Sequence, residues 1–470
     1  MKAKHNILRI VRICLAAFFF VAVTLLFLGI DWRINQYLGW TAKLQFAPAV
    51  MALNISVLVL LVVLTFIFGR IYCSVICPLG ITQDLIAWLG KQKKIGRKNR
   101  YTYSPEKKGL RFTVLAIFLI GLIVGFAPVL TLLDPYAAFG RMAQSWTLNS
   151  ITIVVAAITL VALVILAWRN GRTYCNTICP VGTILSFCAR FSWLRVQIDE
   201  DKCNKCGRCS MNCKASAIDF KNGTVDYSRC VACGDCLDKC KHDALGYRSI
   251  SCKSDSSCES VDTGKRAFLT GTAFAVGSAA MAQAKIKVDG GLADLEEKKV
   301  PKRETPITPP GSISARNMAR HCTACQLCVS ACPNRVLRPS TDPLRFMQPE
   351  LSFENGFCRP ECTRCSQVCP TGAIKPIQPE DKPLIHIGHA VWIAENCIPV
   401  SNGDSCGLCA RKCPEGAIIM VDYTTQDGRT VQVPAVDNER CIGCGKCDYL
   451  CPARPLSAIY VEGNVTHHYE

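Results

Sequence analysis

The stretch GRIYCSVICPLG, residues 69–80, returns almost unchanged as GRTYCNTICPVG, residues 171–182. Each copy carries two cysteines four positions apart, which lie on one face of a helical turn, and the proline directly after them discourages that turn from continuing. An uncharged apolar run precedes each copy. The sequence therefore predicts an internal repeat, a two-helix hairpin that ends in a CxxxCP motif.

Four uncharged apolar runs account for much of the hydrophobic half of the chain. Each run holds about 18 to 22 residues, which is enough for a helix to cross the roughly 30 Å core of a bilayer. The runs cover residues 13–30, 47–68, 112–133 and 151–168. We expect an all-α membrane domain of four transmembrane helices with an internal two-helix repeat. The alternative is a set of buried helices in a soluble domain.

Positive charge predicts the orientation of these helices. Residues 91–111 carry nine Lys or Arg residues and the N-terminus carries four, whereas the other two loops carry few. Because positive residues stay inside, we expect the N-terminus, residues 69–111 and the chain after Trp168 to be cytoplasmic. Both CxxxCP motifs then emerge on one face. Much of the formal net charge of +18 belongs to this signal, so no nucleic-acid partner is indicated.

Most of the 32 cysteines fall into six quartets. Two quartets have the spacing C-x2-C-x2-C-x3-C, and each of the four that follow is closed by a proline. In bacterial ferredoxins this run holds a [4Fe–4S] cube with three close thiolates, while the fourth ligates the neighbouring cluster. The quartets are Cys203, Cys206, Cys209 and Cys213; Cys230, Cys233, Cys236 and Cys240; Cys322, Cys325, Cys328 and Cys332; Cys358, Cys362, Cys365 and Cys369; Cys397, Cys406, Cys409 and Cys413; and Cys441, Cys444, Cys447 and Cys451.

Six [4Fe–4S] clusters are the prediction from these quartets. Zinc ribbons use two pairs of thiolates, and disulfides need an oxidising compartment, so neither alternative explains a sixfold recurrence of this spacing. The two clusters expected in residues 203–240 use Cys203, Cys206 and Cys209 with Cys240, and Cys230, Cys233 and Cys236 with Cys213. In residues 322–451 the quartets exchange ligands either as neighbours or in nested order, and the sequence leaves both open.

The CxxxCP cysteines are candidate ligands for a further metal centre. They either converge on one membrane-proximal site or complete two separate sites; they are Cys73, Cys77, Cys175 and Cys179. No CxxCH motif is present and no His lies in a predicted membrane helix, so haem has no expected ligands. GxGxxG and GxxxxGK[ST] are also absent, which indicates no nucleotide site. Electrons would therefore move through iron–sulfur centres or a bound quinone.

The segment between the two ferredoxin regions reads GKRAFLTGTAFAVGSAAMAQA, residues 264–284. A basic pair, Lys265 and Arg266, precedes a mild apolar run ending in an A-x-A triplet, which is typical of a twin-arginine export signal with Lys in place of the first Arg. The alternative is a small-residue linker that stays cytoplasmic. Residues 298–311, KKVPKRETPITPPG, have the composition of a charged, Pro-rich spacer.

Four regions follow from these observations. We expect the four-helix membrane domain over residues 1–195, a cytoplasmic two-cluster ferredoxin domain over 196–250, a linker with the export or anchor segment over 251–312, and a four-cluster polyferredoxin domain over 313–470. Both ferredoxin parts are expected to be α+β and ferredoxin-like.

The motifs resemble a known family. Residues 1–250, with paired CxxxCP motifs and a two-cluster ferredoxin, resemble the membrane ferredoxin NapH; residues 265–470, with an export-like signal and four quartets, resemble its partner NapG. The resemblance implies a natural fusion of two proteins that together act as a quinol dehydrogenase for periplasmic nitrate reductase. Membrane ferredoxins of the NosR, MauN and CcoG kinds share the CxxxCP hairpin.

This resemblance implies a multi-pass protein of the bacterial inner membrane. Quinol from the membrane pool is the expected substrate, and a periplasmic redox enzyme or cytochrome is the expected partner, with residues 313–470 in the periplasm. The alternative is a maturation or regulatory redox protein of the NosR or CcoG kind, which supports assembly of another metalloenzyme. The residues leave one difficulty open, because clusters are expected on both sides of the membrane and no haem ladder connects them.

Overall fold

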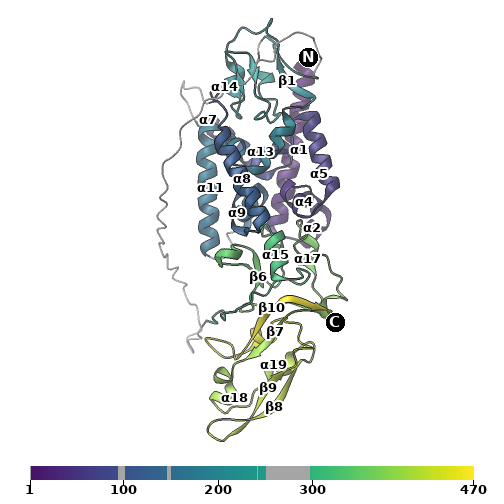
Figure 1. Cartoon of the computed structure of the whole chain (residues 1–470), viewed down its shortest axis with the longest axis vertical. Helices are drawn as coiled ribbons and strands as arrows, with labels where there is room; N and C mark the ends of the chain where they lie inside the picture. The colour runs from purple at the N-terminus through teal and green to yellow at the C-terminus, as the bar shows by residue number, and fades with distance from the viewer. Residues whose placement is uncertain (1, 94–100, 145–149, 241, 250–296, 470) are drawn as a thin grey trace.

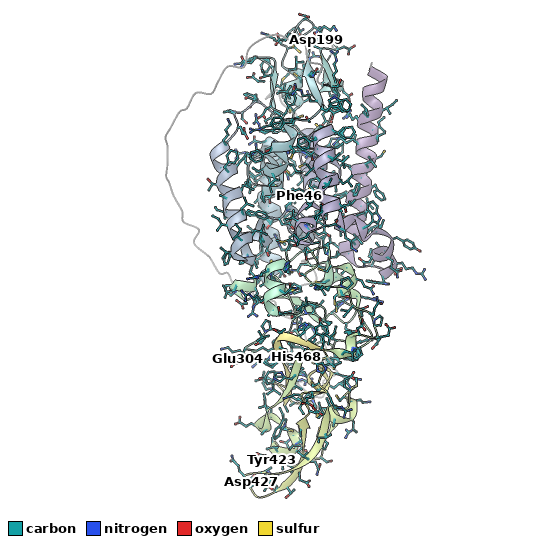
Figure 2. The ribbon with its side chains drawn as sticks, turned by 45° about the vertical axis from the view of Figure 1, so that its right-hand side comes forward. Phe46, Asp199, Glu304, Tyr423, Asp427 and His468 are labelled. Carbon is teal, nitrogen blue, oxygen red and sulfur yellow. The ribbon has the colours of Figure 1, made fainter. Side chains whose placement is uncertain are left out.

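The computed structural model describes residues 2–93, 101–144, 150–240, 242–249 and 297–469. A bundle of helices forms the middle of an elongated molecule, and one small unit with β-hairpins lies at each end (Figure 1). Figure 2 shows Phe46 within the bundle, Asp199 at the outer end of the N-terminal unit and Asp427 at the opposite end of the molecule. The export-like segment 264–284 lies outside the described residues.

The bundle is built from thirteen helices in the described part of the first 190 residues. They are α1 (Lys2–Leu28), α2 (Trp32–Leu38), α3 (Trp40–Lys43), α4 (Phe46–Met51), α5 (Ile55–Phe68), α6 (Tyr72–Val75), α7 (Pro78–Lys93), α8 (Lys108–Val124), α9 (Ala127–Leu133), α10 (Pro135–Gln144), α11 (Ser150–Asn170), α12 (Thr173–Thr177) and α13 (Pro180–Ala189).

Two of the four predicted spans are single helices, and two are broken. Runs 13–30 and 151–168 lie largely within α1 and α11, whereas run 47–68 is divided between α4 and α5. The break occurs at Leu53, whose φ of 51° is left-handed. Asn54 then restarts the helix, because its side-chain oxygen accepts a hydrogen bond from the backbone N–H of Val57 at 3.3 Å.

Run 112–133 is likewise divided, between α8 and α9. Gly125 ends α8 in the left-handed region at φ 76°, a conformation that glycine adopts without steric cost. Two of the helices, over Ile7–Leu28 and Ile151–Asn170, are long and apolar enough to cross a membrane.

The N-terminal ferredoxin unit follows α13 and lies on the end of the bundle that carries the N-terminus (Figure 1). Two antiparallel pairs, β1 with β4 and β2 with β3, form its sheets. Its elements are β1 (Leu194–Ile198), α14 (Arg208–Asn212), β2 (Ile218–Asp219), β3 (Thr224–Val225), η2 (Leu237–Lys239) and β4 (Leu245–Ser249).

The C-terminal unit lies at the other end of the bundle (Figure 1). Its sheets are again two-stranded and antiparallel: β5 with β6, β7 with β10, and β8 with β9. Its elements are α15 (Ala315–His321), α16 (Leu327–Ala331), β5 (Leu337–Pro339), η3 (Pro343–Arg345), β6 (Pro349–Leu351), α17 (Arg364–Val368), η4 (Lys382–Leu384), β7 (Ile385–Trp392), η5 (Ala394–Asn396), α18 (Ile398–Ser401), α19 (Leu408–Lys412), β8 (Ile418–Thr424), β9 (Thr430–Val436), α20 (Lys446–Leu450) and β10 (Ile459–Tyr469).

The Pro-rich segment 298–311 packs onto the C-terminal unit. The N–H of Lys299 donates to the carbonyl of Pro455 at 2.7 Å, and the N–H of Leu351 donates to the carbonyl of Ile307 at 2.8 Å. The Ile307 side chain is fully buried. The segment is therefore an ordered part of the unit that follows it, and the domain boundary at residue 313 stays a prediction.

The C-terminal unit contacts the bundle closely through α10. A Cβ on Gly140 would stand 2.3 Å from the carbonyl oxygen of Cys325 and 2.6 Å from ring atoms of Phe27. The guanidinium of Arg364 lies 5.1 Å from the ring centre of Trp32, within cation–π range. The first C-terminal cysteine quartet thus lies directly against the end of the bundle.

We predict that Gly140→Ala destabilises the protein, because the new methyl group has no room beside Cys325. Overpacking of this kind costs about 1–3 kcal/mol. Gly109→Ala is the matched control, since this helical glycine has no neighbour within 4 Å of a Cβ. Both changes gain the same helix propensity, roughly 1 kcal/mol. Thermal unfolding of the purified protein in detergent should therefore begin at a lower temperature in Gly140→Ala only.

Candidate iron–sulfur centres and the paired cysteine motifs

The two CxxxCP motifs lie together inside the bundle and exchange their arginines. Arg70, from the first copy, donates from Nη2 to the carbonyl of Cys175 at 3.1 Å. Arg172, from the second copy, donates from Nη1 to the carbonyl of Cys73 at 2.7 Å. Both arginines are fully buried. Each motif is therefore held by a side chain of the other.

The repeated glycines allow this close packing. A Cβ on Gly80 would stand 2.2 Å from the carbonyl oxygen of Cys73, and one on Gly182 would stand 2.4 Å from that of Cys175. Pro78 and Pro180 begin α7 and α13, the position where a missing N–H costs no helical hydrogen bond. The recurring proline and the last glycine of the motif thus each have a local structural role.

The four motif thiols form one buried cluster. Each of the four cysteines is 3–4 % exposed. Burial raises the pKa of Cys77 and of Cys179 well above the usual value, and the nearby thiol of Cys175 raises both further. The side-chain amide of Gln83 donates to Sγ of Cys175 at 3.1 Å. Of the two arrangements that the sequence leaves open, the structure has the single convergent cluster.

The charge around this cluster favours a centre held by thiolates. Arg70 has no carboxylate partner within the part of the chain that the structure describes; it bonds the Asn176 side chain at 3.0 Å, the Ser228 carbonyl at 3.0 Å and the Cys175 carbonyl. Its Nη2 also lies 3.8 Å from Sγ of Cys73. A buried cation without a counter-charge is costly. Deprotonated thiolates around an iron–sulfur or other metal centre would supply that charge.

An ionic network joins the second arginine to the N-terminal ferredoxin unit. Arg172 donates two hydrogen bonds to the carboxylate of Asp84, at 2.6 and 2.7 Å. Lys214 bonds Asp84 at 2.8 Å and Asp235 at 3.0 Å. Burial alone would raise the pKa of Asp84, but Arg172 and Lys214 together hold it well below its usual range. Lys214 stands where most quartets have a closing proline, and here it anchors the ferredoxin unit to α7.

The N-terminal unit places Cys213 among the thiols of the second quartet. Burial raises the pKa of Cys236 well above its usual value, and the thiols of Cys233 and Cys213 are among those that raise it further. The N–H of Ala217 donates to Sγ of Cys213 at 3.4 Å. Cys213 thus lies with the second quartet, as one half of the expected ligand exchange requires, and the exchange itself stays a prediction.

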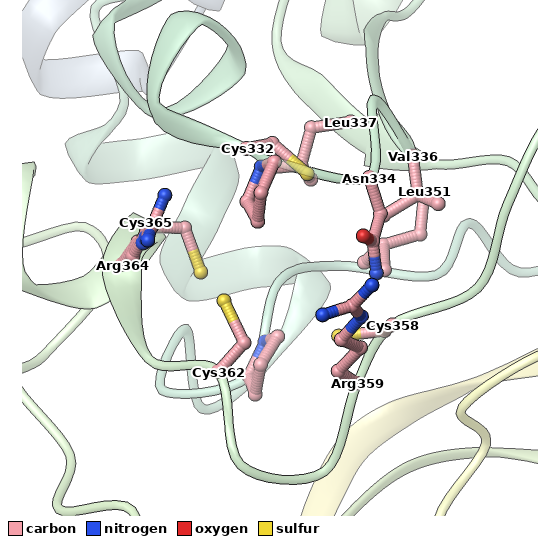
Figure 3. Close-up of a pocket in the computed structure, with 12 residues that line it drawn as sticks. Cys332, Asn334, Val336, Leu337, Leu351, Cys358, Arg359, Cys362, Arg364 and Cys365 are labelled. Atoms are coloured by element: carbon pink, nitrogen blue, oxygen red, sulfur yellow. The ribbon is translucent and has the colours of Figure 1, made fainter. Parts of the chain in front are cut away.

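Thiols of neighbouring C-terminal quartets lie together in space. One cavity is lined by thiols of two successive quartets: Cys332, Cys358, Cys362 and Cys365 (Figure 3). Figure 3 shows the thiols of Cys362 and Cys365 pointing toward one another. Reciprocally, the pKa of Cys325 is raised to about 12, mainly by burial and also by the nearby thiol of Cys369. Residues 322–369 therefore form one two-cluster unit.

The last two quartets repeat this arrangement. The pKa of Cys409 is raised to about 11, mainly by burial and also by the nearby thiols of Cys406 and Cys451. In the same way, burial and Cys413 both raise the pKa of Cys441. Nested pairing of the four quartets is therefore not the arrangement observed.

Within the C-terminal unit, the first pair of quartets contacts the second pair. The N–H of Cys358 donates to the carbonyl of Cys444 at 2.9 Å. The centres thus follow one another from the end of the bundle: the Cys322 quartet lies against α10, the Cys358 quartet beside it, and the Cys441 quartet next.

Backbone amides lie close to several of the candidate ligand thiols. Within the described ranges, no group of three or more His, Cys, Asp or Glu side chains is arranged to hold one metal ion. Backbone N–H groups reach Sγ of Cys322 and of Cys451, both at 3.3 Å, as ligands of a negatively charged cluster require. The ligand roles themselves stay predictions.

Arg70 and Arg172 carry a signal in the sequence, since both recur in the repeat, although neither was a predicted ligand. Asp84 was a candidate proton acceptor only, as an aspartate at a helix end. Its pairing with Arg172 and Lys214 has no sequence signal, because these partners lie 88 and 130 positions away in the chain.

Comparison with protein-family models assigns both ends of the chain to iron–sulfur proteins. A 4Fe-4S binding domain matches residues 50–97 and again 152–197, which contain the CxxxCP motifs. Another 4Fe-4S binding domain matches residues 195–218. A 4Fe-4S dicluster domain matches residues 321–373 and 404–454, in agreement with the pairing of neighbouring quartets. No solved structure matches the chain.

Curated relatives are ferredoxin-type proteins. The chain is 30% identical over 151 residues to the methylamine utilization ferredoxin-type protein MauM of Methylobacillus flagellatus, a match that covers 31% of this chain and 64% of that protein. It is 30% identical over 204 residues to the ferredoxin-type protein NapG of Escherichia coli, covering 39% of this chain and 87% of NapG. Ferredoxin-type NapF of Escherichia coli is 26% identical over its full length. The chain therefore belongs to the ferredoxin-type 4Fe–4S proteins, as a distant relative of NapG and MauM.

Proposed function

We propose that this protein is a membrane-bound electron carrier that oxidises quinol and conducts electrons between its two ferredoxin units through the bundle. One observation carries the proposal: the four buried CxxxCP thiols lie inside a helical bundle that has a ferredoxin unit on each end. The sequence predicts clusters on both sides of a membrane, with no haem to connect them. The thiol cluster, which lies between the two ferredoxin units, would provide that connection.

Exposed apolar side chains support a membrane location for the bundle. Only 28% and 22% of the two candidate spans are buried within the protein. An apolar surface of this extent is unusual in a soluble protein and typical of contact with lipid. Large exposed side chains on four helices include Val11, Leu15, Phe18, Val21, Val59, Leu60, Val63, Ile117, Ile120, Ile123, Val154, Ile158, Val161 and Ile165.

The path on the N-terminal side runs through Arg70. Its guanidinium contacts the Ser228 carbonyl, two residues before Cys230, and also lies beside Cys73 and Cys175. The second ferredoxin quartet and the thiol cluster therefore share one buried side chain. A cation at this position also stabilises the extra negative charge of a reduced centre on either side.

On the other side, the path reaches Cys325 through α10. Tyr174, within the second CxxxCP motif, donates from its hydroxyl to the Leu133 carbonyl at 3.4 Å. Asp134 follows at once and caps α10, accepting hydrogen bonds from the N–H groups of Tyr136 and Ala137, both at 3.1 Å. Gly140 of the same helix packs on Cys325. One short helix thus joins the thiol cluster to the first C-terminal quartet.

Quinol oxidation transfers two electrons, whereas each cluster accepts one. Quinol becomes quinone by losing two electrons and two protons, and the protons pass to solvent. Iron–sulfur clusters supply one-electron acceptors when bound, so two are needed for each quinol. A soluble redox protein outside the cytoplasm receives the electrons from the C-terminal unit. By resemblance, that partner is a periplasmic enzyme such as nitrate reductase.

We expect menaquinol to reduce the clusters of the purified, anaerobically prepared protein. Low-temperature paramagnetic resonance before and after quinol addition provides the measurement, with dithionite as the reference for complete reduction. Dithionite reduction without any quinol reduction would favour the alternative, a maturation or regulatory redox protein.

Replacement of the motif cysteines should interrupt conduction between the two units. In sealed vesicles, dithionite added outside bleaches the iron–sulfur absorbance on both sides of the membrane if electrons cross the bundle. Cys73→Ala with Cys175→Ala should confine bleaching to the clusters on the outer side. Cys188→Ala, on α13 but outside the motifs, should behave as wild type. Complete bleaching in the double variant at unchanged ferredoxin-cluster content would contradict the proposed path.

The opposite placement of the two ferredoxin units predicts that the C-terminus lies outside the cytoplasm. Alkaline phosphatase fused after Glu470 should therefore be active in cells. Changing Lys265 and Arg266 to Gln should abolish that activity if this pair directs export, whereas changing Lys285 and Lys287 to Gln should not. An inactive wild-type fusion at normal protein level would place the C-terminal unit in the cytoplasm.

A further inference from the structure

A cavity of about 470 Å³ lies between α1, α7 and the N-terminal ferredoxin unit. Pockets for small organic ligands occupy roughly 300–1,000 Å³. Apolar side chains of the two helices, among them Ala17, Phe20 and Trp88, form one part of its wall. Trp88 is 54% exposed at the surface of the bundle. This part of the cavity thus adjoins the apolar surface that we assign to lipid.

The other part of the wall is polar and charged. Arg12 of α1, Asp84 of α7, and Lys214 and Asp235 of the ferredoxin unit contribute to it. Within the ranges that the structure describes, Nε of Arg12 is buried without a hydrogen-bond partner. A free donor beside carboxylates suits a ligand whose oxygens are carbonyls in its oxidised form and hydroxyl groups in its reduced form.

The cavity also adjoins two of the candidate redox centres. Ser74 lines it and directly follows Cys73, while Lys214 directly follows Cys213 and Asp235 directly precedes Cys236. A ring bound here would therefore lie between the CxxxCP thiol cluster and the second ferredoxin quartet. Two neighbouring one-electron centres are what a two-electron donor requires.

We infer that this cavity is the quinone site, with the isoprenoid tail leaving between α1 and α7 and the ring oxygen accepting a hydrogen bond from Nε of Arg12. The inference rests on the proposed quinol oxidation and assigns its place. Asp84, which already accepts from Arg172 and Lys214, also pairs with Arg12 at 3.8 Å and holds that guanidinium beside the cavity, while Asp235 accepts from a hydroxyl group of the reduced form.

The larger cavity at the other end of the bundle fits a quinone less well. It has a volume of about 800 Å³ and lies between α1, α2 and the C-terminal unit. Its wall carries four basic residues and two acidic ones, and Arg338 pairs with Glu354 at 3.3 Å; the six are Lys298, Arg335, Arg338, Arg364, Glu297 and Glu354. A charged wall with a basic excess suits an anion or the face of an acidic partner better than an uncharged ring.

Binding of a quinol analogue tests the assignment without requiring turnover. The fluorescent analogue 2-heptyl-4-hydroxyquinoline N-oxide is titrated against the cluster-loaded, detergent-solubilised full chain. Ala17→Trp fills the cavity from an exposed position on α1, and Ala157→Trp places the same bulk at an exposed position of α11 outside it. We expect the dissociation constant to rise at least tenfold in Ala17→Trp and to stay within twofold in Ala157→Trp. Arg12→Gln should raise it about tenfold.

The outcomes separate this site from the proposed function. Unchanged affinity in both Ala17→Trp and Arg12→Gln, or no binding by the wild-type protein, would overturn the site. If quinol nevertheless reduces the wild-type clusters, the function stands and the site lies elsewhere. If the analogue binds as expected but quinol reduces no cluster, the cavity binds quinones and the proposed quinol oxidation is wrong. A matching loss of quinol reduction and of binding in Ala17→Trp would support both.

Discussion

The reciprocal hydrogen bonds that Arg70 and Arg172 donate to each other's CxxxCP motif are the interactions on which the rest of the bundle depends. Each guanidinium is fully buried and donates to a backbone carbonyl of the other CxxxCP motif, so neither hairpin can close without its partner. Glycines at positions 80 and 182 leave the space that this approach needs. Two buried guanidinium groups in the bundle each need a negatively charged group nearby. Asp84 supplies it for Arg172, and for Arg70 the thiolates of a bound centre would do so.

The two halves of the repeat differ at the positions that contact the N-terminal ferredoxin unit. Asp84 has no acidic counterpart in the second copy, where Ser186 occupies the equivalent place. Lys214 reaches Asp84 and ties the N-terminal ferredoxin to the first hairpin. Asn176, in turn, bonds Arg70 and the Ala215 carbonyl, which ties the second hairpin to the same unit. A nearly symmetric pair of motifs is in this way oriented toward a single ferredoxin.

Pairing of neighbouring quartets gives the C-terminal unit its linear form. Closing a shorter loop costs less conformational entropy than closing a longer one, so a cysteine reaches an adjacent quartet more readily than a distant one. Each pair then folds locally, and the backbone contact between Cys358 and Cys444 joins the pairs. The resulting order of quartets leads away from the bundle, as the proposed function requires.

The sequence by itself determined the chemistry of this protein. Ligand types and spacings of the ferredoxin kind are local, so the quartets and the repeat could be predicted directly, and the ligand exchange within residues 203–240 stays a prediction. Tertiary structure decided the rest: that four motif thiols share one site, that the later quartets pair as neighbours, and that residues 298–311 are packed. It also divided two of the four predicted spans, where Leu53 and Gly125 adopt left-handed conformations. The physical reason is distance along the chain, because contacts such as those of Asp84 with Arg172 and Lys214 join residues 88 and 130 positions apart, and no local pattern encodes them.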